Sequence, residues 1–254
     1  MDLFNLSGRV ALVTGGNGGI GFGMAEGLAA AGAAVMIAGR DQLKSDAAVA
    51  ALREHGRTAE AVTVDVADEP SCHAMVAAAI GSFGRLDILI NNAGINIGKQ
   101  PQEMTLTEWN TVLATNLTGA FVAAQAAYPN MKRQGSGKII NIGSMFSLFG
   151  APFVSAYSAS KGGIIQLTKS LATAWAADKI QVNAVLPGWI DTDLTRRARE
   201  RRPELHDNVL RRTPAGRWGT PRDLAGVAVF LASAASDFVT GAAIPVDGGF
   251  ASQG

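Results

Sequence analysis

Short runs of apolar, often β-branched residues alternate along the chain with longer segments in which apolar residues recur at helical spacing. The short runs predict seven strands that are buried on both faces, over 9–14, 34–39, 60–64, 86–91, 138–143, 180–185 and 242–246. The longer segments predict helices over 19–31, 41–55, 69–83, 105–131, 155–177 and 221–234. Because strand alternates with helix throughout, the pattern indicates an α/β fold with a parallel sheet covered by helices on both faces.

The chain shows no linker-like or low-complexity segment, so we expect one domain over 1–254. One long segment, 187–217, carries neither pattern and is expected to be irregular. Loops of this length in compact domains are usually lids or disordered. We therefore expect a substrate lid at about 188–217.

Composition excludes several classes of protein. About 48% of the 254 residues are hydrophobic and the formal net charge is +1, which gives no reason to expect nucleic acid or an acidic membrane as partner. The start "MDLFNLSGRV" lacks the basic and apolar regions of a signal peptide, and no apolar stretch approaches the roughly 20 residues of a membrane span. We expect a cytoplasmic protein that acts on a small molecule.

The metal-binding residue types are sparse. Cys72 is the single cysteine, which rules out an internal disulfide and suits a reducing compartment. The three histidines (His55, His73 and His206) lie far apart in the sequence and lack metal-ligand spacing. No metal site is expected.

A glycine-rich turn follows the first predicted strand. The segment "TGGNGGIG" runs from Thr14 to Gly21 and leads into a predicted helix. Glycines there let a phosphate approach the backbone, and the helix N-terminus offers unpaired N–H groups and a positive dipole end. A glycine-rich turn alone is also compatible with an ordinary structural turn, but its place after the first strand of an α/β chain favours dinucleotide binding.

The TGxxxGIG spacing resembles that of the short-chain dehydrogenase/reductase family. Other family motifs recur along nearly the whole chain: Asp65-Val66, "NNAG" (91–94), Asn116, Ser144, Tyr157 with Lys161, Pro187-Gly188 and "VDGG" (246–249). The resemblance implies a Rossmann-like, doubly wound parallel sheet in the order 3-2-1-4-5-6-7. It also implies that ligands bind at the carboxyl ends of the strands.

The resemblance further implies which residues form the site. The catalytic residues would be Asn116, Ser144, Tyr157 and Lys161. The cofactor would be held by Gly15, Asn17, Gly19, Ile20, Gly21, Arg40, Asp65, Val66, Asn92, Ala93, Gly94, Tyr157, Lys161, Pro187, Gly188, Ile190 and Thr192.

The spacing of Tyr157 and Lys161 has a chemical reason. Residues four apart on a helix lie on one face. A free phenol has a pKa near 10, and we expect the nearby ammonium to lower it so that Tyr157 exchanges a proton with an alcohol or alkoxide. Ser144, at the end of a predicted strand, would orient the substrate oxygen. The resemblance implies that Lys161 also reaches the ribose and that Asn116 holds a water for proton relay.

Cofactor preference is usually set where the second strand ends. An acidic residue there binds the ribose 2′-hydroxyl, whereas an arginine accommodates a 2′-phosphate. Here Gly39 is followed by Arg40, which favours NADP(H). NAD(H) stays possible, because Asp41 is adjacent and the glycine turn offers only neutral Asn17 as a second contact.

The substrate is less well defined by the sequence. The N-terminus "FNLSGRVALVTG" and the segment "SMFSLFG" resemble family members that act on gluconate-type sugar acids, while 3-oxoacyl-carrier-protein reductases and a catalytically silent cofactor-binding scaffold are the alternatives. The arginines of 188–217 would attract an acidic substrate or form a solvated surface. The residues expected to line the pocket are Asn96, Met145, Phe146, Phe153, Trp189 and Leu194.

A homotetramer is expected. The predicted helices over 105–131 and 155–177 are rich in Ala, Ser and Gly on several faces. Helices that are apolar around most of their circumference need burial on more than one side, and the sheet covers only one. Pairing with a second copy across a twofold axis would cover the other side.

Overall fold

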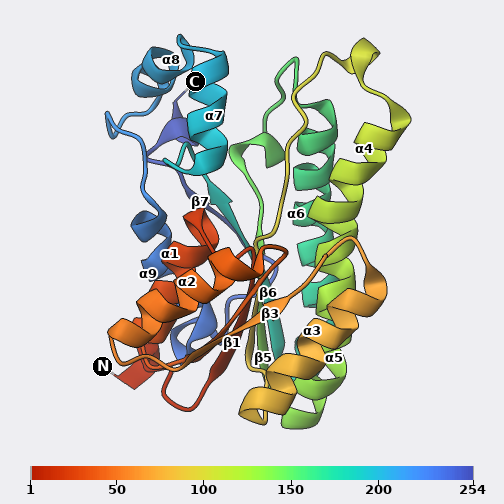
Figure 1. The fold of residues 1–254 in the computed structure, drawn as a ribbon, viewed down its shortest axis with the longest axis vertical. Helices are drawn as coiled ribbons and strands as arrows, with labels where there is room; N and C mark the ends of the chain where they lie inside the picture. The colour runs from red at the N-terminus through yellow and green to blue at the C-terminus, as the bar shows by residue number, and fades with distance from the viewer. Residues whose placement is uncertain (1, 254) are drawn as a thin grey trace.

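The computed structural model describes residues 2–253, so the expected domain extends beyond it by residues 1 and 254. One parallel sheet forms the centre of the molecule (Figure 1). Its strands are β1 (Val10–Thr14), β2 (Ala34–Gly39), β3 (Ala59–Thr63), β4 (Ile88–Asn91), β5 (Gly137–Ile142), β6 (Ile180–Pro187) and β7 (Ala243–Val246). The order is β3-β2-β1-β4-β5-β6-β7, which confirms the expected doubly wound topology.

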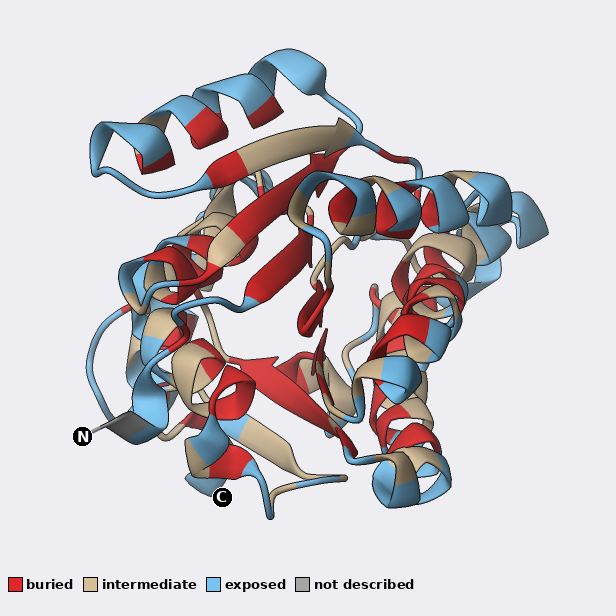
Figure 2. Cartoon of the chain, turned by 90° about the horizontal axis from the view of Figure 1, so that it is seen from below, coloured by how far each residue is buried: buried red, intermediate tan, exposed pale blue. Residues whose placement is uncertain are grey.

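Helices cover both faces of this sheet (Figure 1). They are α1 (Gly19–Ala30), α2 (Gln42–Glu54), α3 (Glu69–Phe83), α4 (Leu106–Leu113), α5 (Gly119–Gln134), α6 (Ser155–Trp175), α7 (Asp193–Arg201), α8 (Leu205–Arg212) and α9 (Ala225–Ala232). Helices α1, α2 and α9 pack in one apolar cluster, and α3, α5 and α6 pack in another on the opposite face. Figure 2 shows the buried positions on the strands and on the sheet-facing sides of these helices.

The segment expected to be one helix over 105–131 is two helices joined by a π-helical turn, Ala114–Thr118. The hydroxyls of Thr111 and Thr115 donate to carbonyls one turn earlier, which competes with regular backbone bonding. The buried side chain of Asn116 bonds to the loop after β4. These local bonds were not visible in the apolar spacing, and turns of this kind are frequent at functional sites.

The segment 187–217 was expected to be irregular, and this expectation was wrong. The segment contains α7 and α8. Helix α7 begins after Thr192, whose hydroxyl accepts from the backbone of Thr195. It ends before Pro203, which cannot continue a helix. The many arginines of this segment hid the helical spacing, because few of its positions are apolar.

The strand order reverses between β1 and β4, and this places the crevice of the sheet at the carboxyl ends of those two strands. The glycine turn follows β1, and the "NNAG" segment overlaps the end of β4. Within residues 2–253, no helix has both the length and the apolarity that crossing a membrane would require.

Candidate active site

The glycine turn after β1 is held open toward the crevice by Asn92. Gly15 and Gly19 have positive φ angles of 61° and 52°, which favour glycine. The Asn92 amide donates to the carbonyl oxygens of Thr14 (3.0 Å) and Gly15 (3.1 Å). These two bonds fix the turn backbone just before α1, whose N-terminus offers the unpaired N–H groups that suit an anion.

A cavity of about 160 Å³ lies beside this turn. It gathers residues from the ends of β1, β2, β3 and β4: Gly15, Asn17, Gly39, Arg40, Val64, Asp65, Val66, Ala93, Gly94, Ile95 and Thr115. Most of them are among the expected cofactor residues. Gly39, Val64, Ile95 and Thr115 are additional lining residues, each next to or within two positions of an expected one.

The remaining expected cofactor residues have mixed environments. The methyl Cγ2 of Thr192 lies 3.3 Å from the position that a side chain on Gly19 would occupy, so Thr192 borders the turn. Ile20 packs against the core and Ile190 is buried within it. Pro187 ends β6, and the amide of the next residue, Gly188, donates to Val246 O at 3.0 Å. The turn, the cavity and Thr192 adjoin one another near the start of α1 and together form a cradle.

The four candidate catalytic residues come from three elements and meet next to this cradle. Tyr157 and Lys161 lie on α6, Ser144 follows β5, and Asn116 lies in the π-helical turn. Lys161 Nζ is 5.7 Å from the centre of the Tyr157 ring. A side chain on Gly94, which lines the cavity, would lie 3.5 Å from Lys161 Nζ and 3.3 Å from Asn116 Oδ1. The cavity and the catalytic group therefore share one wall.

Asn116 joins the π-helical turn to the loop after β4. Its Oδ1 accepts from Ile95 N at 2.8 Å, and its Nδ2 donates to Ile95 O at 2.9 Å and to Ser160 Oγ at 3.1 Å. Both amide hydrogens are thus used within the protein. The resemblance implies a relay water at Asn116. Such a water would have to donate to the backbone or side-chain carbonyl oxygen of this residue.

The electrostatics of the Tyr157–Lys161 pair differ from the expectation that the ammonium lowers the tyrosine pKa. Burial raises the pKa of Tyr157, and a hydrogen bond with Ser144 acts in the opposite direction. Burial also lowers the pKa of Lys161 from 10.5 to about 8. The cost of burying a charge outweighs the attraction, and the Lys161 ammonium donates to Ile142 O at 2.7 Å. A lysine with a pKa of about 8 exchanges protons near neutral pH.

The buried lysine predicts a specific pH dependence of stability. Between pH 8 and 10.5 the unfolded chain keeps the Lys161 proton and the folded chain has lost it, so stability rises with pH in this window. Relative to Lys161→Met, the unmodified protein should gain about 2–3 kcal/mol in unfolding free energy between pH 7 and 10. Urea unfolding measures this difference. Lys169→Met provides the control, because Lys169 is exposed. If the difference in unfolding free energy between the unmodified protein and Lys161→Met did not change with pH, as expected for Lys169→Met, the burial of a charge at Lys161 would be contradicted.

An aromatic row extends from Tyr157 toward the segment 188–217. Phe146 meets the Tyr157 ring edge-on at 6.2 Å and the Trp189 ring at 6.0 Å, and Trp189 meets Trp218 at 5.7 Å. Phe146 therefore lies beside Tyr157 and Trp189 beside Phe146, and their place in the wall of a substrate pocket stays a prediction. Trp218 was missed, although an aromatic residue just beyond an arginine-rich segment was a usable signal.

The other expected pocket residues differ in their environments. Met145 is buried in a small core cluster with Ile165 and Leu186, so it supports the site from behind and does not line it. Leu194 is half exposed on α7. The Asn96 Oδ1 atom is buried without a partner among residues 2–253, which leaves an acceptor available.

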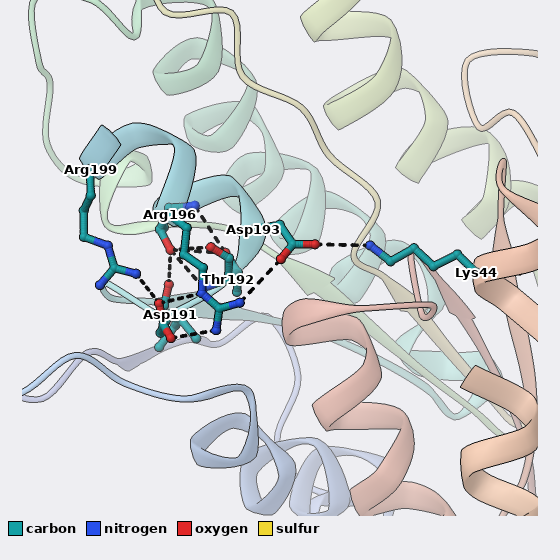
Figure 3. A network of polar contacts seen from close by, with 8 residues as sticks. Lys44, Asp191, Thr192, Asp193, Arg196 and Arg199 are labelled. Atoms are coloured by element: carbon teal, nitrogen blue, oxygen red, sulfur yellow. Dashed lines mark hydrogen bonds and ion pairs between the residues drawn. The ribbon is translucent and has the colours of Figure 1, made fainter. Parts of the chain in front are cut away.

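The arginines of 188–217 differ in their surroundings: some pair with carboxylates or lie over aromatic rings, whereas Arg197 and Arg201 are exposed to solvent. Arg196 and Arg199 both bind Asp191 (Figure 3). Asp191 and Asp193 add to the acidic residues of this segment and reduce its positive surplus. Arg199 also lies over the Trp218 ring at 4.4 Å, whereas Arg202 lies over Phe153 at 3.3 Å and has no carboxylate partner among residues 2–253.

No cluster of three or more His, Cys, Asp or Glu side chains suited to a metal ion occurs among the described residues. Cys72 is buried, and its thiol donates to Val66 O at 3.5 Å.

The sequence is similar to those of known proteins over nearly its full length. A family model described as enoyl-(acyl carrier protein) reductase matches residues 15–251. A 2-dehydro-3-deoxy-D-gluconate 5-dehydrogenase of Formosa agariphila is 42% identical over 98% of this chain and 95% of its own length. The gluconate 5-dehydrogenase of Gluconobacter oxydans is also 42% identical, over 98% of this chain and 96% of its own.

The fold is also similar to that of solved structures. A gluconate 5-dehydrogenase from Burkholderia cenocepacia, in complex with NADP and tartrate, superposes with a TM-score of 0.95 at 41% identity, covering 100% of this chain and 99% of its own. Identity at this level over nearly the full length, together with the geometry of Ser144, Tyr157 and Lys161, shows that the chain belongs to the short-chain dehydrogenase/reductase family.

Proposed function

We propose that this protein catalyses the reversible oxidation of a secondary alcohol of a sugar acid to its ketone with NADP(H). The observation that carries the proposal is the shared wall at Gly94, which places the Lys161 ammonium beside the dinucleotide cradle and within reach of Tyr157. The relatives that act on gluconate and 2-dehydro-3-deoxy-D-gluconate support the sugar acid. They favour it over the acyl-carrier-protein alternative, and the intact set of Asn116, Ser144, Tyr157 and Lys161 counts against a silent scaffold.

In this proposal the bound nicotinamide accepts or supplies the hydride. Tyr157 donates its proton to the developing alkoxide during reduction and accepts it from the alcohol during oxidation. Ser144, which is hydrogen-bonded to Tyr157, holds the substrate oxygen in place. Lys161, whose pKa is about 8, would restore the tyrosine proton. The family resemblance implies that Lys161 would also hold the ribose of a bound cofactor. Burial raises the pKa of the phenol, so Tyr157 is protonated at rest and suited to donate its proton during reduction. For oxidation Tyr157 must first pass this proton to Lys161, and the resulting phenolate then accepts the proton of the alcohol.

Arg40 supports the preference for NADP(H). It follows β2, is exposed, lines the cavity and has no hydrogen-bond or ion-pair partner among residues 2–253. The guanidinium is therefore free to pair with a phosphate. The Burkholderia cenocepacia relative was solved with NADP.

Arg40→Ala should lower kcat/KM for NADPH by at least about tenfold and leave that for NADH within about twofold, because only the 2′-phosphate contact is lost. Steady-state rates with both cofactors measure the ratio. Equal efficiency of the unmodified protein with NADPH and NADH would contradict the assigned preference.

We further propose that residues 188–217 form a lid over the substrate. The lid contacts the segment just before α6, where Arg202 lies over the ring of Phe153. Phe153 is an expected pocket residue, and Arg202 has no carboxylate partner among the described residues, so Arg202 is the lid arginine best suited to bind the carboxylate of a sugar acid.

A substrate panel tests the proposed reaction. Gluconate, 2-deoxygluconate, simple polyols and acetoacetyl thioesters are supplied in turn, with nicotinamide absorbance followed in both directions. We expect turnover of a sugar acid, with Arg202→Met raising KM for the acid more than for an uncharged polyol. Activity on the thioester alone would favour the acyl-carrier-protein reading, and no activity on any generic ketone would favour the scaffold.

We propose a homotetramer located in the cytoplasm. Helices α5 and α6 contact the sheet on one side only, and Phe121 on α5 is 41% exposed in the single chain. A second copy packed on this face would cover Phe121. Light scattering at micromolar concentration should give four times the mass of one chain, 26.2 kDa, and Phe121→Lys should reduce it. A monomer in the unmodified protein would contradict the proposal.

A further inference from the structure

The ammonium of Lys44 lies against the glycine turn. Lys44 is at the start of α2, where its backbone N–H donates to the capping carboxylate of Asp41 at 3.1 Å. A side chain on Gly18 would lie 3.0 Å from Lys44 Cε and 3.1 Å from Lys44 Nζ. Lys44 therefore fills the space that Gly18 leaves, and it brings a positive charge to a turn that has none of its own.

This position is held by a second link between the turn and α2. The Asn17 amide donates to Ser45 Oγ at 3.0 Å, and Ser45 is fully buried. The corner between the turn and α2 is thus fixed next to Gly39, where the ribose 2′ position is recognised in dinucleotide folds. Arg40 borders the same corner from the end of β2.

Lys44 pairs with the lid across this corner. Its Nζ lies 3.3 Å from Oδ2 of Asp193, the first residue of α7 (Figure 3). The side chains are 49% and 65% exposed, and an exposed pair of this kind contributes little to stability. Arg196 lies 3.7 Å from Oδ1 of Asp193, so Asp193 keeps a cationic neighbour when Lys44 turns away.

We propose that Lys44 is a second residue for the 2′-phosphate of NADP(H), acting with Arg40, and that Asp193 of the lid competes with the phosphate for its ammonium. A phosphate monoester carries nearly two negative charges at neutral pH and offers three acceptor oxygens, so it is a stronger partner than an exposed carboxylate. Bound NADP(H) would then release the lid from α2, which NAD(H) would not do. This inference rests on the proposed NADP(H) preference.

Binding in the absence of substrate tests the inference. Dissociation constants for NADPH and NADH are measured by nicotinamide fluorescence on the full chain. Lys44→Met, which keeps the aliphatic stem, should weaken NADPH about tenfold and leave NADH within about twofold. Asp193→Asn should tighten NADPH a few-fold, and this gain should vanish in the Lys44→Met background. The matched control is Lys132→Met, because Lys132 is an exposed lysine also 3.3 Å from a carboxylate, Asp178 on another part of the surface.

Each contrary result has a distinct meaning. If Lys44→Met weakens NADPH and NADH equally, Lys44 contacts the shared diphosphate and the inference is wrong. If it changes neither while the unmodified protein still prefers NADPH, Lys44 has no part in recognition and Arg40 acts alone. If the unmodified protein binds both cofactors equally, the proposed preference fails together with the inference. A gain from Asp193→Asn that persists without Lys44 would mean simple charge repulsion and would overturn the competition.

Discussion

Replacing Tyr157 with phenylalanine should lower kcat by about 10³-fold or more while the dissociation constant for NADPH changes less than about twofold. The substitution removes one hydroxyl and keeps the ring, which packs edge-on against Phe146 at 6.2 Å. The fold and the cradle should therefore persist, and only the proton donor is lost. Single-turnover rates of NADPH oxidation, together with fluorescence titration of the cofactor, separate the two effects.

Tyr128, the other tyrosine of the chain, provides the matched control. Its hydroxyl donates to Asp178 at 2.8 Å and its ring stacks on Trp175, away from the cradle. Tyr128→Phe removes the same atom, so it should affect stability slightly and leave kcat unchanged. Retention of most activity by Tyr157→Phe would show that another group moves the proton, and Ser144 would be examined next.

The strands could be predicted from the sequence because their signals were local, whereas the strand order was implied by the family resemblance. Buried strands require continuous apolar runs, and all seven strands occurred with boundaries within about two residues of those observed. The expectation that all are buried on both faces was wrong for β3 and β7, which are only partly buried because they lie at the edges of the sheet. The glycine turn was recognisable because close approach of backbone to phosphate leaves few alternatives to glycine. The candidate catalytic residues were placed together by the family resemblance, because only Ser144 follows a strand, whereas Tyr157 and Lys161 lie on α6 and Asn116 lies in the π-helical turn.

Features that depend on contacts between distant segments could not be predicted. The π-helical turn at Asn116 arises from bonds to Ile95, 21 residues earlier. The pairing of Lys44 with Asp193 joins residues 149 positions apart. The pKa of Tyr157 was predicted in the wrong direction because spacing shows that Lys161 is near but not how deeply both groups are buried.

These failures concern the same part of the molecule. The sequence pattern predicts single helices and strands, whereas the site lies where several of them meet: the glycine turn, α2, the π-helical turn and the lid. Burial there depends on all of them at once. The cost of placing Lys161 in that environment is consistent with a functional site that is less stable than a purely apolar core would be.

Gly21→Ala should have the largest effect on stability among the substitutions considered, with a loss of about 3 kcal/mol or more in unfolding free energy and loss of NADPH binding. An added methyl group would overlap the Gly15 carbonyl oxygen and the Asn92 amide nitrogen. Displacing Asn92 would break its bonds to Thr14 and Gly15, which hold the turn open. Neither the turn backbone nor the clamped amide has room to move.

Gly81→Ala in α3 makes the same chemical change where nothing lies within 4 Å of the new methyl group. It should stabilise the protein by about 0.5–1 kcal/mol, since alanine loses less conformational freedom in a helix than glycine. Thermal unfolding of the two variants, with and without NADPH, gives both quantities in one experiment. Opposite signs are expected because glycine is required at 21 by close packing and is only tolerated at 81. If Gly21→Ala unfolded like the unmodified protein and still bound NADPH, the turn would be looser than the Asn92 clamp implies, and the phosphate cradle would have to lie elsewhere.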